Sequence, residues 1–121
     1  MLTINSCERS TIDGKWDDNI KLTAKDIVLS KNQQSLTIKT EYSNWWISDI
    51  IYKENSVDLN GIEKTAKNFI LNKADFQIER KDDGKTISIK MNENNSNSDR
   101  ILKFELQNGD YFDRIMVTQN K

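Results

Sequence analysis

Apolar and polar residues alternate along most of this chain in short runs, and turn-forming residues such as Asn, Asp and Gly separate the runs. A period of two residues is typical of β-strands with one buried and one exposed face. The runs fall at residues 20–29, 35–40, 44–52, 76–80, 86–91, 100–107 and 111–119. Because most of them follow one another without a helical segment between, the pattern predicts an all-β, immunoglobulin-like antiparallel β-sandwich of about seven strands.

The first three runs predict strands of different kinds. Residues 20–29 are expected to form the first edge strand, either continuous or broken once. Residues 35–40 alternate strictly, with Leu36 and Ile38 on one face, which predicts a central strand with one solvent-exposed face. Residues 44–52 are apolar in both phases, so both faces of this strand should be covered by other parts of the chain.

The C-terminal half predicts two hairpins. Asp83-Gly84 joins the fourth and fifth runs and is a strong hairpin signal, and Asn108-Gly109-Asp110 joins the last two. The stretch 92–99 between the hairpins is polar throughout and reads as a loop that cannot pack a core. Five residues of the closing hairpin are expected to point inward: Leu102, Phe104, Leu106, Ile115 and Val117.

The stretch 53–75 leaves two interpretations open. Ile62, Ala66, Phe69 and Ile70 would share one face of a short helix. The same stretch is equally compatible with an irregular excursion that carries an extra strand near residues 69–71. Asn60-Gly61 marks a turn in either case.

Length and charge indicate one water-soluble domain. The 121 residues suffice for a single core, and the charged residues, 31% of the chain, sum to a net charge of -1 without forming blocks. This charge distribution argues against nucleic-acid binding, and no apolar run approaches the roughly 20 residues that cross a bilayer. We expect a domain at 16–121 preceded by a tether at 1–15, with a partly open barrel as the competing architecture.

Several kinds of catalytic site are excluded by composition. The chain has no His and one Cys, so it lacks the imidazole on which typical zinc enzymes and Ser/His or Cys/His hydrolases depend. Acidic pairs at Asp17/Asp18 and Asp82/Asp83 could serve glycoside hydrolysis only at defined separations in a cleft, so we interpret them as solvated caps and turns. The oxygen ligands at Asp17-Asp18-Asn19 lack the spacing of a dedicated calcium loop. The sequence predicts no enzymatic activity, no metal and no cofactor.

Cys7 is a candidate lipidation site. It follows Leu2-Thr3-Ile4-Asn5-Ser6, with an aliphatic residue three positions before it and a small residue directly before it. This arrangement is similar to the cleavage end of bacterial lipoprotein signals, although neither a cationic start nor an apolar core precedes it here. One interpretation is a lipoprotein signal remnant, with export to the outer membrane or cell surface and membrane contact only through a lipid on Cys7. The other is an ordinary unreactive thiol in an N-terminal arm.

An ordered set of segments resembles the BACON domain family, immunoglobulin-like modules of secreted and surface proteins of Bacteroidetes. The segments are Trp16-Asp17-Asp18-Asn19-Ile20-Lys21-Leu22, Leu36-Thr37-Ile38, Asn44-Trp45-Trp46-Ile47, Ile87-Ser88-Ile89-Lys90-Met91, Arg100 and Ile115-Met116-Val117-Thr118-Gln119. The resemblance is closest to small lipoproteins that carry one such domain, and it implies a module associated with carbohydrate or mucin binding or a plain spacer. The stretch 53–75 is longer than the family pattern, and the family supplies no binding residue to carry over.

Four aromatic residues form the predicted ligand surface, namely Trp45, Trp46, Tyr52 and Tyr42. Neighbours on a strand point to opposite faces, so one tryptophan should fill the core while the other faces outward, either covered by 53–75 or exposed. An exposed ring can stack on the apolar face of a sugar. We therefore expect a non-enzymatic cell-envelope module that contacts a glycan or a surface protein, with a structural spacer or assembly subunit pairing through a sheet edge as the alternative.

The remaining conspicuous side chains have simpler interpretations. Tyr111 and Phe112 form a second aromatic pair and are expected to serve mainly in sheet packing. Charged residues in the outward phase of the strands, among them Glu79, Lys103 and Glu105, are expected to provide solubility and to protect the sheet edges from aggregation.

Overall fold

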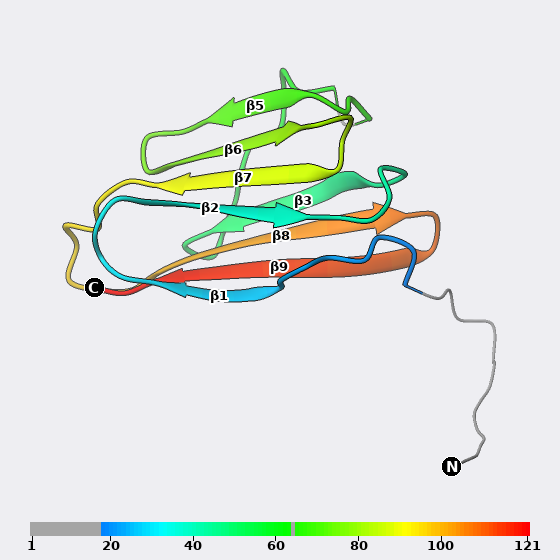
Figure 1. Cartoon of the computed structure of the whole chain (residues 1–121). Coiled ribbons are helices and arrows are strands. Elements are labelled where there is room, and N and C mark those ends of the chain that lie inside the picture. Colours follow the sequence, from blue (N-terminus) through cyan, green and yellow to red (C-terminus); the bar gives the residue numbers. More distant parts are fainter. Residues whose placement is uncertain (1–17, 64) are drawn as a thin grey trace, which may run out of the picture.

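The computed structural model describes residues 18–63 and 65–121, and in this part of the chain it has nine strands and no helix. The strands are β1 (Asp26–Leu29), β2 (Gln34–Lys39), β3 (Trp46–Tyr52), β4 (Asn55–Ser56), β5 (Phe69–Asn72), β6 (Phe76–Lys81), β7 (Thr86–Met91), β8 (Arg100–Asn108) and β9 (Tyr111–Gln119). They form two sheets packed face to face, with the orders β1-β9-β8-β3-β4 and β2-β7-β6-β5 (Figure 1). The neighbours β3-β8-β9 and β2-β7-β6 match strands C-F-G and B-E-D of an immunoglobulin sandwich, so the predicted fold class is confirmed.

The first predicted strand is broken once, and its two parts join different sheets. Leu22 forms an antiparallel bridge with Thr40 just beyond β2, whereas β1 pairs with β9 in parallel. The expectation of a wholly antiparallel sandwich was therefore wrong at this edge. The alternation of residues sets which face of a strand is buried but does not set the direction of its neighbour.

The strand predicted as central, residues 35–40, is an edge strand. Of the named strands, β2 pairs only with β7, although its face pattern is as expected, with Ile38 buried and Thr37 and Lys39 exposed. Its outer edge is partly covered by Thr23, whose amide donates to the Lys39 carbonyl at 3.0 Å. An exposed face therefore could not distinguish a central strand from an edge strand.

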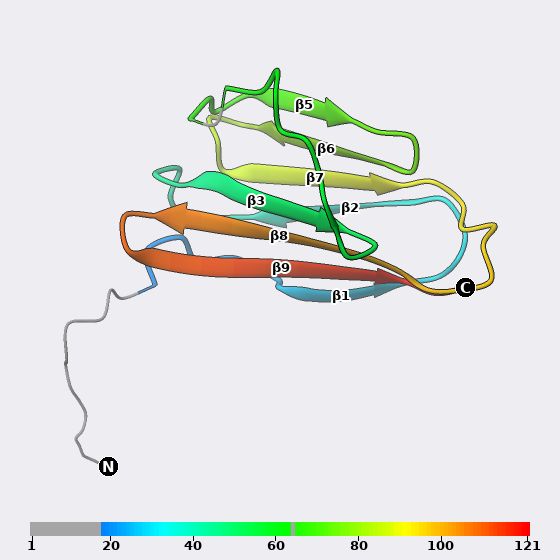
Figure 2. The same ribbon diagram turned by 180° about the vertical axis from the view of Figure 1, so that it is seen from behind.

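The stretch 53–75 is an irregular excursion with extra strands, which settles the two interpretations against the helix. The two-residue β4 extends the five-stranded sheet, and the chain then crosses to the other sheet, where β5 pairs with β6 (Figure 2). Leu59, Ile62 and Phe69 pack against the core from this excursion. Their spacing reflects one buried side of an irregular segment rather than one face of a helix.

Both predicted hairpins are present. β6 pairs with β7 around the Asp83-Gly84 turn, and β8 pairs with β9 in continuous register. The five residues of the closing hairpin that were expected to point inward are each exposed by 1% or less. The closing hairpin therefore anchors the five-stranded sheet to the core.

A β-bulge in β3 explains why residues 44–52 are apolar in both phases. Ile47 pairs with Leu106 and Asp49 pairs with Glu105, so Ser48 has no partner in the ladder. The Ser48 hydroxyl donates instead to the Glu105 carboxylate at 2.8 Å. Because the extra residue shifts the side-chain phase by one, side chains before and after the bulge that would otherwise share a face lie on opposite faces.

Arg80 occupies an inward position of β6 and is only 1% exposed. The centre of its guanidinium lies 3.5 Å from the centroid of the Trp45 ring, a cation–π contact. The guanidinium donates to four backbone carbonyls, those of Ser43 (3.0 Å), Trp45 (2.8 Å), Ala66 (3.3 Å) and Gly84 (3.1 Å). Burial lowers the pKa of Arg80 to about 10, and no carboxylate in residues 18–63 or 65–121 forms a salt bridge with it.

We expect Gly84→Ala to destabilise the protein more than Gly61→Ala. Both glycines have left-handed φ values, 83° and 89°, so both alanines carry a conformational cost of about 1–2 kcal/mol. A Cβ at Gly84 would lie 2.9 Å from Nη2 of Arg80, which four hydrogen bonds hold in place, whereas a Cβ at Gly61 meets nothing within 4 Å. Crowding at Gly84 should add about 1–3 kcal/mol, measured by urea unfolding.

The same pair of glycines tests whether crowding against Arg80 causes the larger destabilisation by Gly84→Ala. In an Arg80→Met background the excess cost of Gly84→Ala should shrink, because the flexible thioether can move away, and the Gly61→Ala cost should stay the same. Equal costs for the two glycine variants in the unmodified chain would contradict the rigid placement of Arg80.

Candidate functional site

Two of the four aromatic residues predicted to bind a ligand face the core. Trp45 is 2% exposed, and its indole Nε1 donates to the Tyr42 carbonyl at 3.0 Å and to the Thr40 hydroxyl at 3.2 Å. Tyr52 points inward after the bulge, and its ring centroid lies 5.0 Å from that of Phe76. Trp45 therefore offers no surface to a ligand, and Tyr52 is half-buried against the core.

The other two, Trp46 and Tyr42, lie at the end of the sandwich where β3 begins. Trp46 is half-buried on the outer face of the five-stranded sheet, and Tyr42 is 44% exposed in the preceding loop. Tyr52 lies at the opposite end of the seven-residue β3, roughly 20 Å from Trp46. The structure therefore does not bring Tyr42, a tryptophan and Tyr52 into one patch.

The strand register places a different aromatic residue beside Trp46. Trp46 pairs with Gln107 of β8, and Gln107 pairs with Phe112 of β9, which is 50% exposed. We call these three residues the aromatic row. Its two rings are separated by one strand, a spacing of about 10 Å, and both lie on the outer face of the five-stranded sheet.

Phe112, expected to serve mainly in sheet packing, faces outward, and the sequence does contain the signal for this orientation. Ile115 and Val117 are both fully buried, so counting back in steps of two puts Tyr111 inward and Phe112 outward. Tyr111 does pack against the core. Which outward residue of another strand lies beside Phe112 depends on register, which the sequence does not supply.

Charged groups lie next to the aromatic row along the same strands. Asp49, Glu105 and Arg114 pair across β3, β8 and β9 in the neighbouring outward row. A depression of about 340 Å³ beside Phe112 is lined by Lys25, Asp26, Glu105, Phe112, Asp113 and Arg114. The Lys25 ammonium lies 3.0 Å from the Asp113 carboxylate, and that hydrogen bond raises the pKa of Lys25. Rings and hydrogen-bonding groups thus adjoin on one face, as in a surface that binds an amphipathic ligand.

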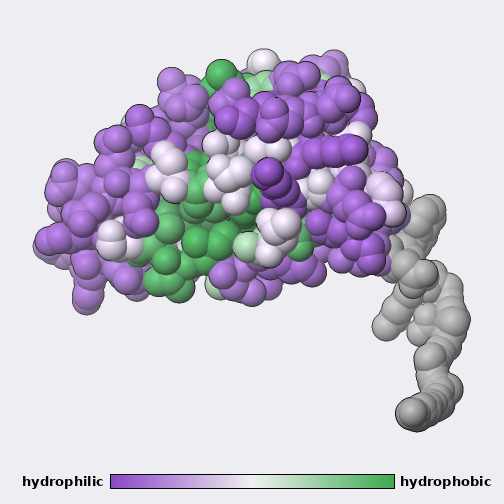
Figure 3. All heavy atoms as spheres, viewed as in Figure 1, coloured by the Kyte–Doolittle hydropathy of each residue, from purple (hydrophilic) through white to green (hydrophobic). Residues whose placement is uncertain are grey.

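The outer face of the four-stranded sheet has a different character. Its depression, about 160 Å³, is lined by Ser35, Gln77, Glu79, Ser88 and Lys90. Seen from this side, most of the molecule is hydrophilic, and a hydrophobic patch lies between β1 and β2, where the edges of the two sheets open (Figure 3). The aromatic groups of the outer surface therefore favour the five-stranded sheet as the candidate site.

The carboxylate pairs have local structural roles where the structure describes them. Burial would raise the pKa of Asp18, but hydrogen bonds from the amides of Lys21 and Ile20 outweigh burial and lower the pKa. Asp82 and Asp83 sit in the β6–β7 turn with left-handed φ values of 56° and 60°. Within residues 18–63 and 65–121, no three His, Cys, Asp or Glu side chains are grouped closely enough to hold a metal ion.

Two predictions concern the N-terminal part of the chain. Cys7 and Trp16 lie outside the described residues, as does the tether at 1–15. In the part that the structure describes, no helix is long and apolar enough to span a bilayer.

Buried polar side chains hold together the end of the sandwich opposite the aromatic row, and sequence alternation did not identify them. Arg100 and Gln119 face each other from β8 and β9, with exposures of 8% and 0%. Gln119 donates to the Asn92 carbonyl at 2.8 Å, and Arg100 donates to the same carbonyl at 3.2 Å. Asn94, in the polar loop that was expected not to pack a core, is 3% exposed.

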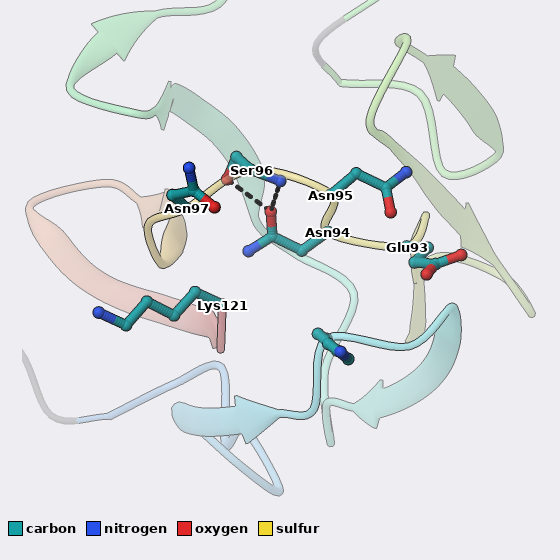
Figure 4. Close-up of a pocket in the computed structure, with 7 residues that line it drawn as sticks. Glu93, Asn94, Asn95, Ser96, Asn97 and Lys121 are labelled. Atoms are coloured by element: carbon teal, nitrogen blue, oxygen red, sulfur yellow. Dashed lines mark hydrogen bonds between the residues drawn. The ribbon is translucent and has the colours of Figure 1, made fainter.

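Beside Asn94, a polar pocket of about 570 Å³ opens to solvent (Figure 4). It is lined by Lys31, Glu93, Asn94, Asn95, Ser96, Asn97 and Lys121. These residues come from the β1–β2 loop, the β7–β8 loop and the C-terminus. The pocket is the second candidate site, and it contains no aromatic side chain.

Comparison with known proteins identifies a solved structure of similar fold. An NMR structure of a protein from Bacteroides thetaiotaomicron matches with a TM-score of 0.70 and 17% sequence identity, covering 94% of this chain and 96% of that one. The two proteins share a fold. At this identity, the similarity says nothing about function. No protein-family profile matches the chain, and no curated protein matches it.

Two further structures are similar only at a lower level. An endo-fucoidan hydrolase of glycoside hydrolase family 107 matches with a TM-score of 0.47 and 11% identity over 98% of this chain and 15% of that one. Titin domain M7 matches with a TM-score of 0.41 and 6% identity over 84% of this chain and 93% of that one. At TM-scores below 0.5, neither similarity bears on fold or function here.

We expect the free energy of unfolding to fall as the pH rises above about 10, partly because of Tyr52. Burial, with a 2.7 Å hydrogen bond to Asp75, raises the pKa of the Tyr52 hydroxyl above its ordinary value. The phenol ionises more readily in the unfolded chain. The stability that the neutral Tyr52 hydroxyl contributes is therefore complete below pH 10 and is lost as the pH approaches the folded-state pKa. Urea unfolding at a series of alkaline pH values measures this slope.

Tyr52→Phe should make the free energy of unfolding fall less steeply with pH. It should also lower that free energy by about 1 kcal/mol at neutral pH, because the hydrogen bond to Asp75 is lost. Tyr111, whose pKa is also raised by burial, should account for much of the pH dependence that remains in Tyr52→Phe. Gln77→Ala is the control, because Gln77 lies on the outer face of the other sheet and its side chain does not ionise. An unchanged slope in Tyr52→Phe would show that this hydroxyl is not protected in the folded protein.

Proposed function

We propose that this protein is a non-enzymatic cell-envelope module of the BACON type that binds carbohydrate on the outer face of its five-stranded sheet. The observation that supports a ligand there is the aromatic row, in which Trp46 and Phe112 lie on either side of Gln107. Of the four residues first predicted, Trp46 is retained in the site and Tyr42 lies near it, while Trp45 is buried in the core and Tyr52 packs against the core. Phe112 supplies the second ring.

The geometry of the row suits an oligosaccharide rather than a single sugar. Two rings about 10 Å apart can each stack on the apolar face of a different sugar residue. The neighbouring Glu105 and Arg114 offer an acceptor and donors for hydroxyl groups. Because these groups stand on three paired strands of a rigid sheet, little conformational entropy is lost on binding.

The proposed location is the bacterial cell surface, with a lipid on Cys7. Support comes from the residues that precede Cys7 and from the resemblance to single-domain lipoproteins described above. The described domain begins at the end of the sandwich that carries the aromatic row (Figure 1).

A structural spacer or assembly subunit is the second candidate function. Val28, on the edge strand β1, is 69% exposed, and Ile70, on the edge strand β5, is 56% exposed. Exposed aliphatic residues at a free sheet edge favour contact with another protein. Association that depends on protein concentration, with no sugar binding, would support this function over the first.

Replacing either ring of the aromatic row should weaken glycan binding. We expect Phe112→Ala and Trp46→Ala each to raise the Kd at least about fivefold, because a stacked ring contributes about 1 kcal/mol. A glycan array with mucin-type and plant polysaccharides identifies the ligand, and isothermal titration calorimetry measures the Kd.

Gln77→Ala is the matched control, since Gln77 lies on the outer face of the other sheet. Phe112 is half exposed, so its replacement should leave stability nearly unchanged and separates binding from folding. Binding that is insensitive to both ring replacements would remove the aromatic row as the site, and release of reducing sugar would contradict a non-enzymatic function.

Lipid attachment at Cys7 can be tested in cells. A palmitate analogue should label the product expressed in a bacterial host that processes lipoproteins, and a Cys7→Ser variant should remain unlabelled and leave the membrane fraction. Equal labelling of the two proteins would exclude Cys7 as the anchor.

A further inference from the structure

The polar pocket at the end of the sandwich opposite the aromatic row has a rigid frame. The frame is Asn94, whose Nδ2 donates to the carbonyls of Ser98 (2.9 Å) and Asn120 (3.1 Å). Its Oδ1 accepts from the amide (3.0 Å) and the hydroxyl (2.6 Å) of Ser96. An asparagine side chain has two donor hydrogens and two acceptor lone pairs, so every hydrogen-bonding position of Asn94 is used within the protein.

The same residue fixes the three segments that form the pocket relative to one another. The backbone amide of Asn94 donates to the Lys31 carbonyl at 2.7 Å, which ties the β1–β2 loop to the β7–β8 loop. The side chain reaches the Asn120 carbonyl, which ties the C-terminus to both. Because Asn94 is buried, these hydrogen bonds are shielded from water and hold the pocket in one shape.

The other lining side chains are available to a ligand. Glu93, Asn95, Asn97, Lys31 and Lys121 form no side-chain hydrogen bond or salt bridge with any residue in the described part of the chain. Figure 4 shows Glu93, Asn95 and Asn97 of the β7–β8 loop and Lys121 of the C-terminus at the pocket, with Glu93 and Lys121 on opposite sides of it. Together they supply two ammonium donors, one carboxylate acceptor and two amides that both donate and accept.

This set of groups specifies the chemistry of the ligand. No apolar or aromatic side chain lines the pocket, so a lipid or an aromatic compound would gain nothing there. The charges of Lys31, Lys121 and Glu93 are of mixed sign, unlike a dedicated anion site. A sugar residue presents several hydroxyl groups that each donate and accept, which matches the mixture of donors and acceptors.

We propose that this pocket binds a single neutral sugar residue through hydrogen bonds, as a second carbohydrate site independent of the aromatic row. Phe112, in the aromatic row, lies near the start of the nine-residue β9 and the pocket at its end, so the two sites are roughly 25 Å apart. One short oligosaccharide cannot occupy both. The two sites would instead let the module hold two chains, or distant parts of one chain.

The test is an NMR titration of the ¹⁵N-labelled full chain with the methyl glycosides of galactose, mannose, fucose and N-acetylglucosamine. At least one should produce saturable shifts confined to the amides of Lys31, the 92–97 loop and Lys121. The double variant Asn95→Ala/Asn97→Ala should raise the Kd for that glycoside about tenfold, because two hydrogen bonds are lost. Trp46→Ala should leave these shifts unchanged.

Three outcomes would overturn the proposal. One is the absence of saturable shifts at the pocket with all four glycosides. Another is that sodium sulfate at matched ionic strength produces the same shifts, which would indicate a simple anion site. The third is shifts only at Trp46, Gln107 and Phe112, which would support carbohydrate binding at the aromatic row while removing the pocket as a site.

Discussion

The stacking of Arg80 on Trp45 is the contact on which one end of the sandwich depends. A guanidinium buried without a carboxylate partner is tolerated because four carbonyls and the indole face surround it. Those carbonyls belong to the loop before β3, the excursion and the β6–β7 turn, so one side chain joins segments from both sheets. In antibody domains the tryptophan at this place packs on a disulfide. With its single Cys, this chain cannot form that internal bond, and an arginine occupies the tryptophan face.

The position of the candidate site follows from the way the core is built. Trp45 enters the core before β3 starts, so Trp46 must face outward, and the bulge at Ser48 then turns Tyr52 inward. Of the four rings predicted to form one surface, Trp45 and Tyr52 thereby face the core, while Trp46 and Tyr42 remain outside. The register of β3, β8 and β9 provides Phe112 as the neighbour of Trp46.

Different buried polar side chains hold the loops at the two ends of the molecule. Arg80 serves one end, and Asn94, Arg100 and Gln119 serve the other, where their hydrogen bonds join the β7–β8 loop to the C-terminus. All four are buried polar residues, which the hydrophobic pattern assigned to strands or loops without further role. Each satisfies backbone carbonyls that the loops leave unpaired, so the loops at both ends are ordered enough to present side chains.

The sequence by itself determined the fold class, the two hairpins and the inward residues of the closing hairpin, because a period of two residues and turn residues such as Asn108-Gly109 act locally. Only the tertiary structure decided that residues 35–40 form an edge, that β1 runs parallel to β9, and that 53–75 carries strands rather than a helix. It also decided which tryptophan is buried and which ring lies beside the other. These outcomes depend on strand order, register and a single bulged residue, and all three are set by contacts between residues far apart in the chain, which no local pattern encodes.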